Sequence, residues 1–204
     1  MIMIWYKILL LATLGICALG CINILFSLIK KGNAKDYAKP AGNPLKGVAY
    51  SMTGAMSPKR KESAYLHLPT YSAGLLYHFG TFLCLFLLIL SFFSISYSNF
   101  LKVAFLGFIA LTSLSGFGIL IKRMVKSGLR SLSNPDDYIS NFLVTIFQIA
   151  TALVVMNWIP DMAYCLIVSL LLLYIPVGKL RHIVYFFAAR YHLGWFYGYR
   201  GVWK

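Results

Sequence analysis

The most constraining feature of the sequence is a series of apolar runs that carry no charge. The clearest are Ile8–Ile29, Ser63–Leu101, Val103–Ile121 and Tyr138–Trp158, and a fifth run starts near Asp161. Each is about 20 residues long or longer, which is the length that a helix needs to cross the hydrocarbon core of a bilayer. The sequence therefore predicts an all-α integral membrane bundle of five transmembrane helices.

Composition supports this class and excludes two others. Of the 204 residues, 60% are hydrophobic and 12% are charged, whereas a soluble domain carries about 25% charged residues. A disordered chain is excluded as well, because disorder requires low hydrophobicity. We expect a single membrane domain over 1–204. Its expected parts are helices over about 5–29, 70–97, 101–125, 138–158 and 161–189, a cytoplasmic loop over 30–69 and a cytoplasmic tail over 190–204.

The charge is strongly basic and unevenly distributed. The chain has 19 Lys and Arg against 5 Asp and Glu, a net charge of +14. In a soluble protein this would suggest nucleic acid, but in a membrane protein basic loops collect on the cytoplasmic side and meet anionic lipids. Only Lys7 and Lys102 fall on the other side of the predicted bundle. The N-terminus is therefore expected outside and the C-terminus in the cytoplasm of a multi-pass protein of the cell inner membrane, in contact with lipids and not with nucleic acid.

Two histidines lie inside the predicted spans, where ionisable groups are costly and usually functional. His78 and His182 are each about 11–13 Å from the same predicted surface, at 1.5 Å rise per residue. Facing imidazoles at one depth could hold a bis-histidine haem b, and the small residues Gly74 and Gly80 would let the macrocycle approach the backbone. The alternative is that each histidine only bonds to a neighbouring helix.

The remaining cysteines and histidines indicate structure rather than chemistry. The four cysteines lie in apolar segments and are expected to be small buried hydrophobes; they are Cys17, Cys21, Cys84 and Cys165. His67 and His192 are expected at the aqueous boundary as interfacial hydrogen-bonding groups. The aromatic tail Tyr191–Trp203 is typical of an interface belt, and the alternative is a docking surface for a peripheral partner.

Two short segments resemble a known family. Tyr77–Gly80 and Pro176–His182 resemble the gamma subunit of respiratory nitrate reductase, and Lys122-Arg123 is similar too. That family comprises five-helix, N-out membrane cytochromes b that oxidise quinol and reduce a cytoplasmic iron–sulfur subunit. The resemblance implies that His78 and His182 ligate a cytoplasm-facing haem. It implies an electron-transfer subunit of a multisubunit quinone-linked oxidoreductase, without catalytic residues of its own.

The chain departs from the family at the second haem. The positions that match its ligands are Leu88 and Tyr164, so the resemblance implies one haem b and puts the family's outer quinol site in doubt. The sequence has no molybdenum or iron–sulfur motif, so catalysis on any substrate other than quinone belongs to a partner. That partner is expected to be a cytoplasmic iron–sulfur subunit, either heterodisulfide-reductase-like or nitrate-reductase-beta-like.

Several polar groups have two interpretations. Five cations are expected either to bind haem propionates or to snorkel to the cytoplasmic surface; they are Lys179, Arg181, Lys122, Arg123 and Arg130. Asn134–Asp137 indicates a turn and helix cap, with quinone protonation as the alternative. Gln148, Ser115 and Asn157 are expected to bond between helices.

Two functions of other classes stay open. One is a small transporter or channel component in which His78 and His182 form a proton-linked or substrate-contacting pair. Against it, the sequence indicates no inverted repeat, no broken helix pair and no intramembrane carboxylate. The other is a non-redox membrane anchor in which the two histidines bridge helices.

Overall fold

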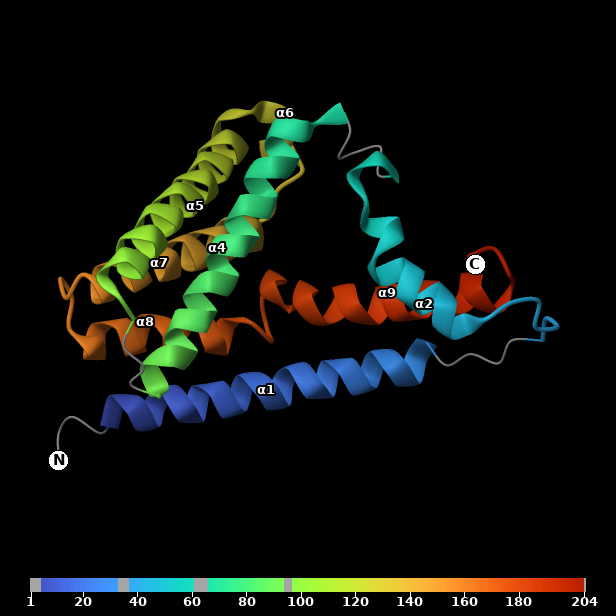
Figure 1. Cartoon of the computed structure of the whole chain (residues 1–204), viewed down its shortest axis with the longest axis horizontal. Coiled ribbons are helices and arrows are strands. Elements are labelled where there is room, and N and C mark those ends of the chain that lie inside the picture. Colours follow the sequence, from blue (N-terminus) through green and yellow to red (C-terminus); the bar gives the residue numbers. More distant parts are fainter. Residues whose placement is uncertain (1–4, 33–36, 61–65, 94–96, 204) are drawn as a thin grey trace. The chain divides into compact units, whose positions relative to one another are not determined.

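Helices form the regular structure of the computed structural model, which describes residues 5–32, 37–60, 66–93 and 97–203 (Figure 1). Four helices are long and apolar enough to cross a membrane. They are α1 (Trp5–Gly32), α4 (Leu68–Phe92), α5 (Asn99–Val125) and α7 (Pro135–Val155). The number rises to five if α8 (Asp161–Tyr174) and the residues Lys179–Tyr199 count as one broken span. Within these residues, the predicted all-α class with several membrane-length helices is confirmed.

The expected continuous helix over 161–189 is interrupted. α8 ends at Tyr174, and a 3-10 turn, η4 (Lys179–Arg181), precedes α9 (His182–Tyr199). Pro176 has no N–H to continue the helical ladder, and the N–H groups of Val177 and Gly178 both donate to the Tyr174 carbonyl, at 3.2 and 2.8 Å. The inference that the chain has no broken helix pair is therefore wrong.

The chain divides into two compact units. Unit 1 comprises Met1–Ile16 and Pro69–Lys179, and unit 2 comprises Cys17–Leu68 and Leu180–Lys204. In unit 1, α7 packs against both α5 and α8. The centre of this packing is fully buried and includes Ile109, Phe147 and Val168.

Unit 2 is built on close packing between α9 and α2 (Pro44–Met52). A Cβ on Gly47 would overlap the carbonyl oxygen of Gly194, and a Cβ on Gly198 would lie 2.8 Å from the carbonyl oxygen of Asn43. The N–H groups of Ala41 and Gly42 donate to the Tyr199 carbonyl at the end of α9, at 2.9 and 3.1 Å. The segment expected as a loop over 30–69 thus contains a packed helix, and the expected tail over 190–204 is helical as far as Tyr199. The other short elements within the described ranges are η2 (Gly54–Met56), η3 (Pro58–Arg60) and α6 (Ser127–Ser131).

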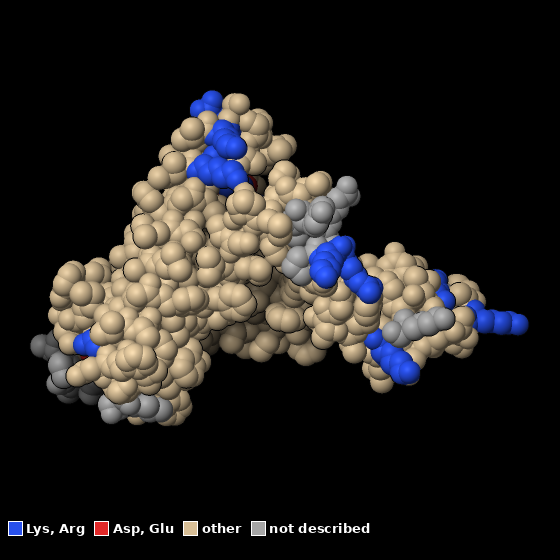
Figure 2. All heavy atoms as spheres, turned by 45° about the horizontal axis from the view of Figure 1, so that its top comes forward, with Lys and Arg blue, Asp and Glu red and all other residues tan. Residues whose placement is uncertain are grey.

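Much of the surface of the long helices is apolar, as expected for helices that contact lipid. On the face drawn in Figure 2, most Lys and Arg of unit 1 lie near the α5–α6 end, others lie on unit 2, and most of the remaining surface of unit 1 is uncharged. Large apolar side chains along the helices are exposed, for example Leu114 at 67% and Phe86 at 50%. An exposed apolar surface of this extent is unfavourable in water and favourable in lipid.

Candidate functional site

His78 lies in α4 with its side chain exposed. Its Nδ1 is 2.7 Å from the carbonyl oxygen of Gly74, one turn earlier. Because a carbonyl oxygen can only accept, Nδ1 carries the hydrogen of this bond, and Nε2 is the ring nitrogen that a metal would use. A Cβ added to Gly74 would meet nothing within 4 Å, so there is open space beside the histidine on that side.

Gly80 does not leave the room for a macrocycle that the sequence predicted. A Cβ there would overlap the side chain of Thr112 on α5, and Gly80 is buried. Its missing side chain lets α4 approach α5, so the expectation that Gly80 admits a macrocycle is wrong.

His182 is the first residue of α9, directly after η4. It belongs to unit 2, whereas His78 belongs to unit 1. The predicted facing of the two imidazoles therefore stays a prediction. Arg181 belongs to unit 2 as well, and its guanidinium lies 5.8 Å from the centre of the Tyr185 ring.

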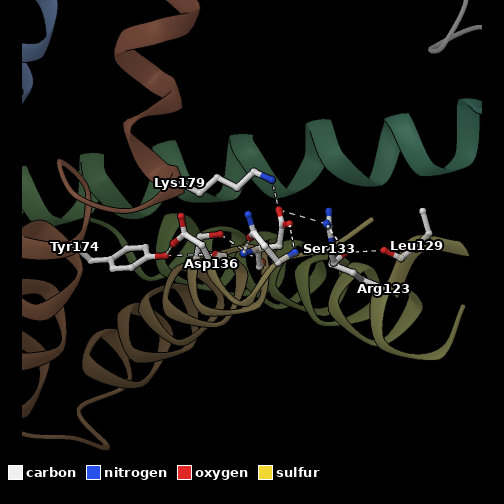
Figure 3. Close-up of polar contacts among 9 residues, drawn as sticks. Arg123, Leu129, Ser133, Asp136, Tyr174 and Lys179 are labelled. Carbon is white, nitrogen blue, oxygen red and sulfur yellow. Dashed lines mark hydrogen bonds and ion pairs between the residues drawn. The ribbon is translucent and has the colours of Figure 1, made fainter. Parts of the chain in front are cut away.

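Two of the predicted propionate partners share a carboxylate (Figure 3). Asp137 is buried in the first turn of α7 and forms ion pairs with Lys179 and with Arg123, the latter at 3.3 Å. Arg123 also donates to Ser133 at 3.0 Å. This cluster joins the end of α5, the start of α7 and the segment after α8, all within unit 1. We call these three residues the Asp137 cluster.

The neighbouring carboxylate and the cap are structural. Tyr174, the last residue of α8, donates to Asp136. Asn134 and Asp137 form a reciprocal capping box at the start of α7, in which each side chain accepts from the other's backbone N–H at 3.0 Å. The predicted helix cap is confirmed.

The other two predicted cations of unit 1 differ in their surroundings. Lys122 donates to the hydroxyl of Thr70 and so links α5 to the start of α4. Arg130 is exposed in α6. Propionate binding by any of the five cations stays a prediction.

A buried polar network, which the sequence indicated only in part, holds α4, α5 and α7 together. Gln148 is fully buried; its amide donates to the Tyr77 carbonyl at 3.0 Å and to Thr81 at 2.9 Å, and it accepts from Thr112 at 3.0 Å. The Tyr77 hydroxyl donates to the Asn141 carbonyl at 2.8 Å. The interhelical role of Gln148 is thus confirmed.

The other two predicted interhelical groups behave differently. Ser115 donates to the Leu111 carbonyl of its own helix at 3.0 Å, so its predicted bond between helices is wrong. Asn157 has a left-handed backbone with φ of 59° after α7, a conformation that Asn tolerates better than most residues. It lines a cavity described below.

The positions matching the family's second haem are packed in unit 1. Leu88 and Tyr164 are 8% and 5% exposed, and the Tyr164 ring stacks on Phe147 with centroids 6.4 Å apart.

Three of the cysteines, Cys17, Cys84 and Cys165, are buried as expected, and Cys21 is partly buried. Among the described residues, no group of three or more His, Cys, Asp or Glu side chains could hold a metal.

The two remaining histidines lie in unit 2. His67 is exposed just before α4. His192 lies against Gly32 at the end of α1, and its Nε2 is buried without a hydrogen-bond partner in the described chain. The expected interfacial hydrogen bond of His192 is therefore not found at that atom.

Comparisons with protein-family models, curated proteins and solved structures found no match for this chain.

Proposed function

We propose that the chain is a membrane cytochrome b subunit that transfers electrons between the quinone pool and a cytoplasmic iron–sulfur partner. One haem b would be held by His78 and His182. The observation that carries the proposal is the His78 ring, whose Nδ1 donates to the Gly74 carbonyl at 2.7 Å. Such a bond fixes the tautomer and orientation of an imidazole whose other nitrogen ligates a metal.

The donor set fits this cofactor. His78 and His182 would hold the haem iron through one imidazole nitrogen each, and the haem would supply reversible one-electron transfer when bound. The open space beside Gly74 provides room on the His78 side. Among the cations, Lys179 pairs with Asp137 and has a side chain that is 51% exposed, and we propose it as one of the residues that would hold a propionate.

The sequence also bears on which subunit would act on a substrate other than quinone. No iron–sulfur or molybdenum motif is present, so a substrate other than quinone would react on a partner subunit. The basic cytoplasmic segments proposed from the sequence would face that partner.

One observation favours a second candidate function, a small transporter. α8 and α9 form a broken helix pair, and discontinuous helices commonly build substrate sites in transporters. In that case His78 would contact substrate or protons and would not bind haem.

A reduced-minus-oxidised absorption spectrum of purified protein from haem-replete cells distinguishes the two. We expect b-type bands and one haem per chain, with the bands lost in His78→Ala and in His182→Ala. His67→Ala is the matched control, because His67 is exposed and outside the proposed site. A folded, colourless protein would reject the cytochrome and leave the transporter, and two haems per chain would reject the single-haem inference.

A further inference from the structure

A cavity of about 390 Å³ lies where four helix ends of unit 1 meet. The ends are the last turns of α4 and α7 and the first turns of α5 and α8. Its apolar wall is formed by Leu87, Val154 and Val155. Because membrane helices end near the headgroup level of the bilayer, this cavity would open at that level if these helices span a membrane.

Two opposite charges line this cavity from different helices. Lys102 comes from the first turns of α5, and Asp161 is the first residue of α8. In the described parts of the chain, the ion pairs present involve Asp137 and neither of these residues. The cavity therefore presents an ammonium and a carboxylate that do not neutralise each other directly.

Lys102 lies at a helix end whose dipole disfavours a cation. The N-terminal end of a helix carries a partial positive charge, which favours anions and disfavours a cation. Lys102 is also one of only two cations outside the basic segments of the sequence. A bound anion beside Lys102 would offset the unfavourable interaction of the ammonium with the helix dipole. Asp161, in contrast, is favoured at the start of α8 by the helix dipole even without a ligand.

Polar side chains also line the cavity. Thr151 is 1% exposed, donates to the Phe147 carbonyl at 2.8 Å and lies 3.3 Å from the Tyr164 hydroxyl. These two hydroxyls therefore have partners already. Asn99 and Asn157 add exposed amides, which can donate to or accept from a polar ligand.

We infer that this cavity binds a zwitterion that carries a phosphate and a primary ammonium, the headgroup of phosphatidylethanolamine. Lys102 would pair with the phosphate and Asp161 with the ammonium, while the apolar wall would contact the glycerol and upper acyl carbons. A neutral ligand such as a quinone ring would leave both charges without an ionic partner. This site does not involve His78 or His182, so it does not depend on the proposed function.

Lipid retention on the full chain tests the inference. Delipidated protein in detergent is given equal amounts of phosphatidylethanolamine and phosphatidylcholine, and bound lipid is measured by native mass spectrometry. We expect a preference for phosphatidylethanolamine on the order of tenfold, because the quaternary ammonium of phosphatidylcholine cannot donate hydrogen bonds to Asp161. Asp161→Asn should abolish the preference, Asp161→Glu should retain it, and Lys102→Gln should reduce retention of both lipids.

Controls and a second probe complete the test. Lys126→Gln, an exposed position between α5 and α6, should leave retention unchanged. Equal retention of both lipids by the unaltered chain, or a preference that survives in Asp161→Asn, would overturn the inference. Free phosphoethanolamine shows whether the ligand is a free zwitterion or a lipid. If it binds saturably to the unaltered chain but to neither Asp161→Asn nor Lys102→Gln, the site belongs to the free zwitterion. If only the lipid is retained, the site belongs to the lipid of the bilayer. A short-chain quinone is the last probe. If Asp161→Asn and Lys102→Gln both weaken quinone binding but leave lipid retention unchanged, the inference is overturned.

Discussion

Gln148 shows how much one side chain can do inside an apolar bundle. It is fully buried and bonds to both α4 and α5. Hydrogen bonds between membrane helices contribute about 0.6 kcal/mol on average, so we expect Gln148→Leu to lower the unfolding free energy by about 1–2 kcal/mol. Ser115→Ala is the control, because Ser115 bonds only within α5. Denaturant titration in detergent measures both, and equal stabilities would contradict the network.

The Asp137 cluster makes a second prediction at this scale. Asp137→Asn would leave Arg123 and Lys179 close together without the carboxylate that they share. Both cations are partly exposed, at 33% and 51% of their side chains, so solvent screens much of their repulsion. We expect a loss of about 1–2 kcal/mol, seen as a lower Tm in detergent that falls less at high salt. Asp161→Asn should not lower the Tm comparably.

At the scale of elements, the contact of α2 with α9 depends on glycine. We expect Gly47→Ala to separate the two helices, because the new methyl group would overlap the backbone of Gly194. Hydrogen–deuterium exchange of the amides in α2 measures this, and we expect faster exchange throughout that helix. Gly118→Ala in α5 is the matched control, since nothing lies within 4 Å of its Cβ position. Unchanged exchange in Gly47→Ala would mean that the packing is looser than described.

The length of the apolar runs alone predicted the existence of α1, α4, α5 and α7. In lipid, an apolar run of this length forms a helix because a helix satisfies all of its own backbone hydrogen bonds. It did not predict the end of α8. Apolar residues continue through Pro176, and proline is tolerated in many membrane helices, so the pattern does not reveal whether the ladder breaks. Gly194 and Gly198 have the small-xxx-small spacing of a helix contact, but their partner Gly47 is remote in sequence.

The site was predictable to a similar degree. His78 stands out as an ionisable residue in an apolar run, yet its bond to the Gly74 carbonyl depends on the local rotamer. The cations Arg123 and Lys179 were recognisable as a basic group, but their shared partner Asp137 is brought to them by the packing of α5, α7 and α8. The sequence shows which residues are charged, but only the tertiary structure shows which of them form ion pairs.

At the scale of the whole molecule, charge distribution determines orientation. In the five-span topology predicted from the sequence, all but two of the 19 basic residues fall on one side of the membrane. Lys and Arg in short loops stay on the cytoplasmic side during insertion. We therefore propose an N-out orientation, in which the α5–α6 end of unit 1 is cytoplasmic and the turn between α7 and α8 is outside.

Cysteine labelling in intact cells tests this orientation. With the four native cysteines replaced by alanine, Trp158→Cys and Gly128→Cys each introduce one thiol at an exposed position on opposite predicted sides. We expect an impermeant maleimide to label Trp158→Cys in intact cells and Gly128→Cys only after permeabilisation. Spectra of both variants check that the replacements preserve the protein. The reverse labelling would put the end of α4 that carries His78 on the outer side, and it would contradict the proposed electron transfer to a cytoplasmic partner.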